Sequence, residues 1–121
     1  PVMEEKMDKN CLFCKIVTGD IPSQKVYEDE TVVAFRDIDP QAPEHILLIP
    51  RRHIPTTLDL AAAERELVGH IFLVAGQLAR KLGFAEAGFR IVNNCNAAGG
   101  QLVWHLHFHL LAGRQMGWPP G

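Results

Sequence analysis

The stretch His105-Leu106-His107-Phe108-His109-Leu110-Leu111 alternates histidine with bulky apolar residues, in a chain of 121 residues that has six histidines. Successive side chains of an extended strand point to opposite faces, so this pattern predicts a strand with three imidazoles on one side and apolar side chains on the other. Imidazole titrates near neutral pH, and a row of imidazoles is expected to hold charged and neutral rings together. Such a mixture suits phosphate chemistry.

The spacing of the row limits the ways in which it can bind metal. With a rise of about 3.3 Å per residue, His105 and His109 lie roughly 13 Å apart along the backbone, too far for all three histidines to bind one ion. A pair such as His105 and His107 can converge on one ion, so a metal-dependent enzyme is one interpretation. A nucleophilic imidazole beside a proton donor is another. A solvated polar face is the third, although strict alternation of histidines has no obvious use there.

Composition indicates one domain without a surface for nucleic-acid polymers. The formal net charge is −2, and the 12 Lys and Arg residues are scattered along the chain. No apolar run of about twenty residues occurs and the first ten residues are charged, so we expect neither a membrane span nor a signal peptide. Three cysteines fit a reducing compartment, so we expect a cytoplasmic protein. We expect a flexible leader at 1–10 and a single domain at 11–121.

Hydrophobic periodicity predicts an α+β fold, in which one main helix packs on an antiparallel sheet. Between Ala61 and Leu82 apolar residues recur every three or four positions, which predicts a long amphipathic helix with Asp59 as its N-cap and Gly83 as its end. Segment 11–17 predicts a turn or a short helix, and segment 95–101 predicts a loop. Strands are expected at 25–28, 31–36, 45–50, 89–94 and 105–111.

Two further groups of residues are compatible with nucleotide binding. Gly99 and Gly100 precede the histidine row, where glycines let a phosphate approach backbone N–H groups. Asp37 lies among apolar residues that form either ordinary core or a purine slot, in which its carboxylate accepts hydrogen bonds from ribose. His45 begins another strand and is a candidate relay partner of the row. The apolar residues of the slot are Phe13, Ile16, Phe35 and Ile38.

Cys11 and Cys14 have the spacing of a zinc knuckle. Zinc needs two more ligands, for which His53 and one histidine of the row are the obvious candidates. A redox pair is less favoured because no thioredoxin-like pattern surrounds the cysteines. Two ordinary buried thiols are the remaining interpretation.

Several segments together resemble one protein family. The motif His105-x-His107-x-His109, followed by two apolar residues, resembles that of the histidine-triad superfamily. Segment 35–45, the pair Gly100-Gln101 and segment 113–121 with its Trp-Pro-Pro-Gly ending resemble the Hint branch, the purine nucleoside phosphoramidases. The similarity covers nearly the whole chain from about residue 11. It implies a five-stranded antiparallel sheet with a short N-terminal helix, and a homodimer that joins two sheets into one.

The resemblance also implies an activity and a set of roles. The substrate would be a purine nucleoside 5′-phosphoramidate, with acyl-adenylates as further substrates, and no cofactor would be required for catalysis. His107 would attack the α-phosphorus to give a nucleotidyl-histidine, from which water releases AMP. His109 would assist at the phosphate, with His45 and His105 in support. The implied nucleotide-binding residues are Phe13, Ile16, Phe35, Asp37, Ile38, Asn94, Gly100, Gln101, Val103 and Trp118, the last reaching toward the leaving group of the partner subunit.

Two departures from the branch matter. Several Hint proteins carry a serine where Leu102 stands, so the rate and the leaving-group preference of this chain are open. The cysteine pair resembles that of zinc-binding relatives in the superfamily, which implies a structural zinc held by Cys11, Cys14, His53 and His105. A dinucleoside polyphosphate hydrolase and a nucleotide-binding adaptor with vestigial catalysis are the alternative functions.

Overall fold

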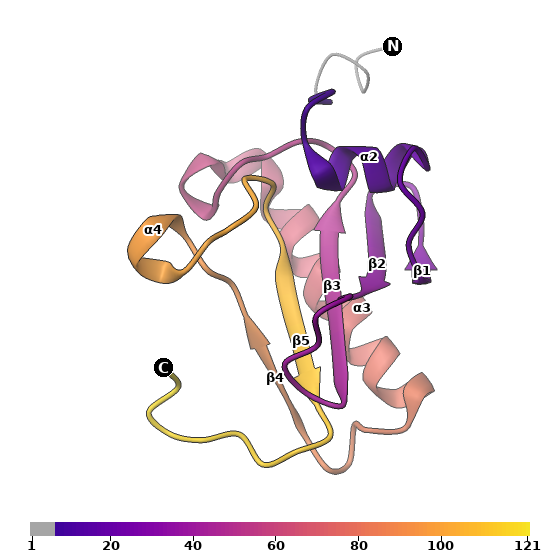
Figure 1. Cartoon of the computed structure of the whole chain (residues 1–121), viewed down its shortest axis with the longest axis vertical. Helices are drawn as coiled ribbons and strands as arrows, with labels where there is room; N and C mark the ends of the chain where they lie inside the picture. Colours follow the sequence, from indigo (N-terminus) through magenta and orange to yellow (C-terminus); the bar gives the residue numbers. More distant parts are fainter. Residues whose placement is uncertain (1–6) are drawn as a thin grey trace.

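A computed structural model describes residues 7–121, so most of the predicted leader, 1–6, lies outside the described residues. Five strands form one antiparallel sheet in the order β1-β2-β3-β5-β4. The predicted α+β fold, with its five-stranded sheet, long helix and short N-terminal helix, is confirmed (Figure 1). The elements are α2 (Leu12–Thr18), β1 (Lys25–Glu28), β2 (Val32–Arg36), β3 (Glu44–Pro50), α3 (Arg65–Leu82), β4 (Phe89–Val92), α4 (Asn96–Gly99) and β5 (Phe108–Ala112).

Each face of the sheet carries its own hydrophobic cluster, because alternate residues of a strand point to opposite sides. Val32 and Ala34 of β2 face α3, whereas Val33 and Phe35 face α2. The cluster under α3 is the larger one and includes the buried helix residues Ile71, Val74, Ala75, Leu78 and Ala79. The sheet is thus a middle layer, with α3 behind it and α2 across the upper ends of β2 and β3 in Figure 1.

The long helix begins later than predicted, and Asp59 is not its N-cap. Helix α3 starts at Arg65, after two 3₁₀ turns at Thr57–Asp59 and Ala62–Glu64. The carboxylate of Asp59 instead accepts hydrogen bonds from the N–H and hydroxyl of Thr56, which closes a capping box on the first of these turns. The helix ends as expected at Gly83, whose φ of 88° is a conformation that glycine adopts without strain.

The predicted histidine strand is ladder-paired only from Phe108 onward. Residues 105–107 are outside the ladder, with a bend at His105, and the N–H of Leu106 donates to the carbonyl of Ile54 at 2.6 Å. The alternation still holds, because Leu106, Phe108 and Leu110 are buried in the cluster under α3. Segment 95–101 is also more ordered than the predicted loop, since it contains the short helix α4.

Within residues 7–121 we find no helix that combines the length and the apolar character needed to cross a membrane.

Candidate functional site

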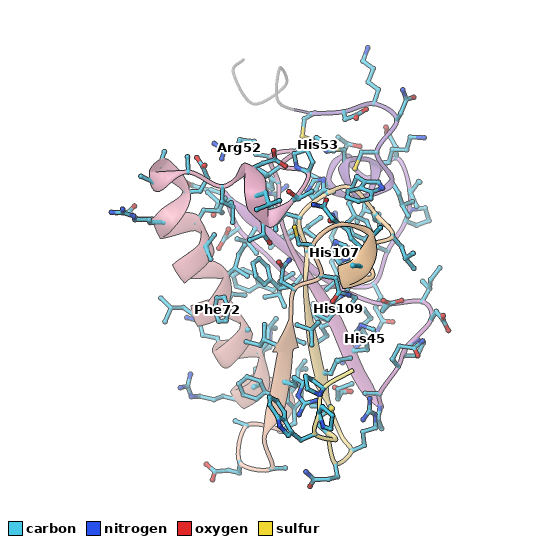
Figure 2. All side chains as sticks on the ribbon, turned by 90° about the vertical axis from the view of Figure 1, so that its left-hand side faces the viewer. His45, Arg52, His53, Phe72, His107 and His109 are labelled. Atoms are coloured by element: carbon cyan, nitrogen blue, oxygen red, sulfur yellow. The ribbon has the colours of Figure 1, made fainter. Side chains whose placement is uncertain are left out.

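The sheet register brings a fourth histidine to the row. In the pairing of β3 with β5, Leu47 lies opposite His109 and His45 lies opposite Leu111. His45 and His109 are therefore diagonal neighbours on one face, close enough for long side chains to touch. The imidazoles of His107, His109 and His45 lie on the face away from α3 (Figure 2). The predicted relay partner is thus placed beside the row by strand pairing.

A backbone carbonyl determines which ring nitrogen of His107 carries the proton. Its Nδ1 lies 2.7 Å from the carbonyl oxygen of His105, and a carbonyl can only accept, so Nδ1 carries the hydrogen. The other ring nitrogen, Nε2, then has a free lone pair. The ring of Phe13 lies edge-on to this imidazole at 5.1 Å between centroids and holds its plane. His107 is presented as a nucleophile at Nε2.

A chain of hydrogen bonds places the proton of His109 on Nε2, the nitrogen that holds the lone pair in His107. The backbone N–H of Gln41 donates to Nδ1 of His45 at 3.0 Å, so the proton of the neutral His45 ring is on Nε2. That Nε2 lies 2.8 Å from Nδ1 of His109, which therefore accepts, and the proton of His109 is on its own Nε2. His109 is thus a hydrogen-bond donor at Nε2, next to the lone pair of His107.

Burial keeps these rings neutral, contrary to the mixture of charges expected from sequence. Loss of hydration lowers the pKa of His109 to about 4, with further lowering from His107 and His45. Burial also lowers the pKa of His107 and of His45, although the carboxylate of Asp37 opposes the shift in both. The row is neutral at pH 7, and its roles are set by hydrogen-bond direction rather than by charge.

A cavity of about 270 Å³ lies against the row and matches the predicted nucleotide slot. It is lined mainly by apolar side chains, with Asp37 at its polar end. The Asp37 Oδ2 atom lies 3.5 Å from Nε2 of His45, so the carboxylate also borders the relay. Leu12 and Leu102 line the cavity as well. Eight of the predicted residues meet here, namely Phe13, Ile16, Phe35, Asp37, Ile38, Val103, His107 and His109.

Four predicted nucleotide-binding residues do not line this cavity: Asn94, Gly100, Gln101 and Trp118. The side chain of Gln101 is 5% exposed and bonds the N–H of Asn96 and the carbonyls of Pro55 and Val103, so it fixes the loop before the row. Gly100 ends α4 with a φ of 83°. The Trp118 ring is 84% exposed and lies 6.0 Å from the guanidinium of Arg90, on β4.

Sequence reasoning missed two residues that orient the histidines. Asn93 follows β4, and its side-chain amide donates to the carbonyl of His107 at 2.9 Å. Gln41 acts through its backbone N–H, as described for His45. Neither leaves a signal in a single sequence, because one role depends on strand pairing and the other on a main-chain group.

The predicted metal ligands Cys11, Cys14, His53 and His105 are brought together, with their ligand atoms within 4.8 Å of one another. Nδ1 of His105 lies 3.4 Å from Cys11 Sγ and 3.5 Å from Cys14 Sγ. Nδ1 of His53 lies 3.4 Å from Cys14 Sγ. A tetrahedral zinc with its usual bond lengths separates sulfur and nitrogen ligands by about 3.5 Å. The three sulfur–nitrogen distances match those of a tetrahedral zinc site.

Surrounding groups orient the same four side chains. Nε2 of His105 donates to the carbonyl of Pro50 at 2.8 Å, which leaves Nδ1 free to bind a metal. Backbone N–H groups donate to both sulfurs, from Asp8 to Cys14 and from Cys14 to Cys11. Burial raises the pKa of the Cys14 thiol to about 11, so a bound cation is needed to displace its proton at neutral pH.

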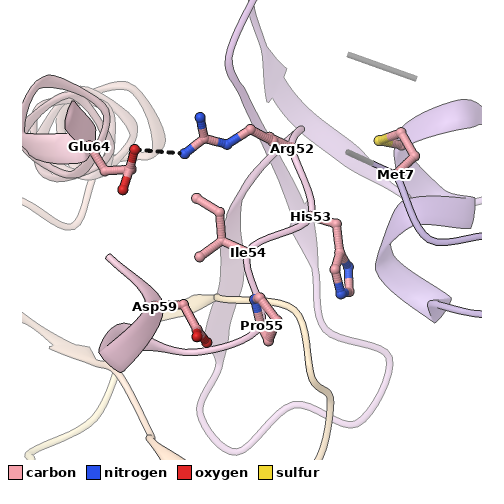
Figure 3. Close-up of a pocket in the computed structure, with 7 residues that line it drawn as sticks. All are labelled: Met7, Arg52, His53, Ile54, Pro55, Asp59 and Glu64. Carbon is pink, nitrogen blue, oxygen red and sulfur yellow. Dashed lines mark ion pairs between the residues drawn. The ribbon is translucent and has the colours of Figure 1, made fainter. Parts of the chain in front are cut away.

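The loop after β3 carries His53 and is fixed at several points. Arg52 points toward Glu64 and pairs with it at 3.1 Å, whereas the side chain of His53 leaves the loop in another direction (Figure 3). These residues line a larger cavity of about 520 Å³ together with Asp59. None of the three row histidines lines it, whereas His107 and His109 line the smaller cavity.

Asp37, His45 and His109 form a second group of close ligand atoms. His45 has one lone pair when neutral, and the N–H of Gln41 already occupies it. Its Nε2 carries the proton that bonds His109, so His45 cannot also bind a metal without losing a contact. The interpretation of His105 and His107 as joint ligands of a catalytic metal is not favoured either, since Nδ1 of His105, which holds its free lone pair, faces the two thiols.

A family model for the HIT domain, the domain of the histidine-triad proteins, matches residues 18–116. The chain belongs to this family. A HIT family hydrolase from Legionella pneumophila has the same fold, with a TM-score of 0.91 and 54% identity over 93% of this chain and 100% of that one. The resemblance inferred from sequence is confirmed.

Two curated relatives differ in what their names state. The purine nucleoside phosphoramidase of Escherichia coli K12 is 48% identical over 111 residues, which are 92% of this chain and 93% of the relative. The 14 kDa zinc-binding protein of Zea mays is 50% identical over 116 residues, 94% of this chain and 90% of the relative. One name concerns the nucleotide chemistry and the other the metal.

The cysteine–histidine cluster predicts that protein purified without chelator contains about one equivalent of zinc. Cys14→Ser is expected to lose most of this zinc and to unfold roughly 5–10 °C lower, because metal binding contributes to folding. The matched control Cys95→Ser, outside the cluster, should keep the zinc content and the unfolding temperature of the wild type. Metal analysis and thermal unfolding measure this. Less than about a tenth of an equivalent, with Cys11→Ser as stable as wild type, would contradict it.

Proposed function

We propose that this protein hydrolyses the P–N bond of purine nucleoside 5′-phosphoramidates and releases the nucleoside monophosphate. The observation that carries the proposal is the opposite polarity of two adjacent neutral imidazoles, a lone pair on His107 and a proton on His109, against an apolar slot with a carboxylate. The phosphoramidase relative supports the same substrate class. Phe13, Ile16, Phe35 and Ile38 hold the base and Asp37 bonds the ribose.

In the first step Nε2 of His107 attacks the α-phosphorus, and the P–N bond to the amine breaks as the new N–P bond forms. The leaving nitrogen accepts a hydrogen bond from Nε2–H of His109 and takes a proton from solvent as it departs, so that His109 stays a neutral imidazole. His45 donates to Nδ1 of His109 throughout, which keeps that ring oriented. The products are a free amine and a nucleotidyl-His107 intermediate.

In the second step a water molecule attacks phosphorus, while Nε2–H of His109 bonds an oxygen of the phosphate. The bond to His107 breaks to release AMP, and the proton of the attacking water returns to solvent. Nδ1–H of His107 stays bonded to the His105 carbonyl, and Asn93 bonds the carbonyl of His107, so the ring is held between the two steps. No metal is used in either step, and zinc at the cysteine–histidine cluster would supply structure alone.

Leu102 is 89% exposed at the rim of the slot, where its side chain offers no hydrogen bond to the phosphate or leaving group. We propose that this rim selects for apolar leaving groups, since an amine with an aliphatic or aromatic body can cover it.

The first test is to trap the intermediate. Mass spectrometry of enzyme quenched with adenosine 5′-phosphoramidate is expected to show one nucleotidyl group on His107. His107→Ala should lose turnover by about 10³-fold or more because it removes the nucleophile, while AMP binding changes by no more than about three-fold. His70→Ala, on the opposite side of the sheet, is the control for loss of a histidine.

Other outcomes would identify another function. Wild-type turnover by His107→Ala would exclude the mechanism. Faster turnover of diadenosine tetraphosphate than of the phosphoramidate would identify a dinucleoside polyphosphate hydrolase. Tight AMP binding with no turnover of any phosphoramidate would identify an adaptor.

The pH dependence provides a second test. Burial holds the pKa of His107 below its ordinary value of 6.5, so Nε2 stays neutral at pH 7 and is protonated only in more acidic solution. We expect kcat/KM to fall on the acid side with a midpoint below 6.5. Asp37→Asn removes a carboxylate that favours the charged ring, so its midpoint should move further down. A midpoint above that of wild type would contradict this assignment.

We also propose that the protein forms a homodimer through β4. This strand ends the sheet and pairs with β5 on one side only. The other edge strand, β1, has an irregular register with β2, which is typical of edges protected from further pairing. Exposed aromatic rings lie near the β4 end of the sheet: Phe89 on β4, and Phe72 of α3, which packs against Phe108 of β5. A second copy that extends the sheet would cover them.

Analytical ultracentrifugation is expected to find a dimer at micromolar concentration. Phe72→Glu should shift it toward monomer, because a charge in an apolar interface loses its hydration. Leu58→Glu, at a site that is 76% exposed on the first 3₁₀ turn, should leave the dimer intact. A monomeric wild type would contradict the proposal.

A further inference from the structure

Helix α2 belongs to two sites at once. Its N-cap Cys11 and its residue Cys14 face the metal ligands His53 and His105. Leu12, Phe13 and Ile16 of the same helix line the nucleotide slot. Seven residues of helix therefore hold parts of both sites, and any displacement of α2 changes both.

Thiol–imidazole contacts join α2 and its N-cap to the other metal ligands. Within residues 7–121, they are the hydrogen bonds that join Cys11 and α2 to His53 and to the histidine row. The remaining attachment is a cluster of eight buried residues that is separate from the larger one under α3. A helix this short is unstable by itself, so its position depends on these contacts.

A direct path leads from the metal ligands to the nucleophile. His105 contacts both sulfurs through Nδ1, and its carbonyl oxygen accepts from Nδ1 of His107. The ring of Phe13 lies edge-on to both imidazoles, with centroids at 6.0 Å from His105 and 5.1 Å from His107. Phe13 thus contacts both the metal ligand His105 and the proposed nucleophile His107.

We propose that metal occupancy of the cysteine–histidine cluster sets the affinity of the nucleotide slot. With metal bound, α2 is fixed and the slot is preformed. Without metal, a nucleotide must first order α2, and that entropy reduces its affinity. We expect the difference to be about ten-fold, within the usual range of coupling between two sites. The inference rests on the proposed nucleotide site, and it makes Cys11, Cys14 and His53 positioning residues for the slot.

Coupling of this kind is reciprocal. If zinc raises AMP affinity by a given factor, AMP must raise zinc affinity by the same factor. Loss of metal should leave the sheet and α3 folded, because their hydrophobic cluster does not include α2.

The test is a calorimetric titration of AMP into zinc-loaded protein, into the same protein after chelation, and after zinc is restored. We expect AMP binding about ten-fold weaker after chelation and recovered with zinc. Hydrogen exchange should become faster at the α2 amides and stay unchanged in α3. A competing chelator measures zinc affinity with and without AMP, and the same factor should appear.

Variants separate coupling from general loss of stability. Cys14→Ser should weaken AMP binding as chelation does, whereas Cys95→Ser should not. Val74→Ala, in the core under α3, lowers stability without touching α2 and should keep wild-type AMP affinity. If Cys14→Ser does not fold, AMP affinity of the wild type after chelation and after zinc is restored still tests the coupling.

Equal AMP affinity with and without zinc, within about two-fold, would overturn the inference and leave the proposed function intact. Absence of AMP binding to the zinc-loaded protein would overturn the nucleotide site, and with it both proposals.

Discussion

The hydrogen bond from Nδ1–H of His107 to the carbonyl of His105, 2.7 Å long, determines how the row of histidines works. It places the free lone pair of His107 on Nε2, toward the slot. The same residue that supplies the carbonyl also faces the two thiols with its side chain. One residue therefore belongs to the metal cluster through its ring and to the catalytic geometry through its backbone, so the two sites cannot be arranged independently.

Burial gives these hydrogen bonds their effect. In water three neighbouring imidazoles exchange protons freely, but beneath α2 the charged forms are disfavoured and each neutral ring must hold one proton on a defined nitrogen. Backbone groups decide which nitrogen holds it: carbonyl oxygens accept from His105 and His107, and the N–H of Gln41 donates to Nδ1 of His45. Three chemically identical side chains thereby differ in the nitrogen that is free to bind: Nδ1 of His105 and Nε2 of His107 hold lone pairs, whereas Nε2 of His109 holds a proton.

Sequence was informative where a local pattern carries the information. Alternation in 105–111 placed histidines and apolar residues on opposite faces, and that holds even though ladder pairing begins at Phe108. The spacing of Cys11 and Cys14 indicated a pair of zinc ligands with His53 and His105 as candidate partners, and the structure brings the four side chains together. Asp59 was a misleading signal, because its carboxylate had a nearer partner in Thr56.

The sequence by itself determined the family, the α+β fold and the residue types available for chemistry, because these follow from periodicity and motif. Only the tertiary structure decided which nitrogen of each histidine carries a proton, since the partners that fix it come from other segments and are often main-chain groups, as at Gln41. It also decided that α2 serves both the metal cluster and the slot. Such roles depend on distances between residues remote in sequence, and a linear pattern does not encode those distances.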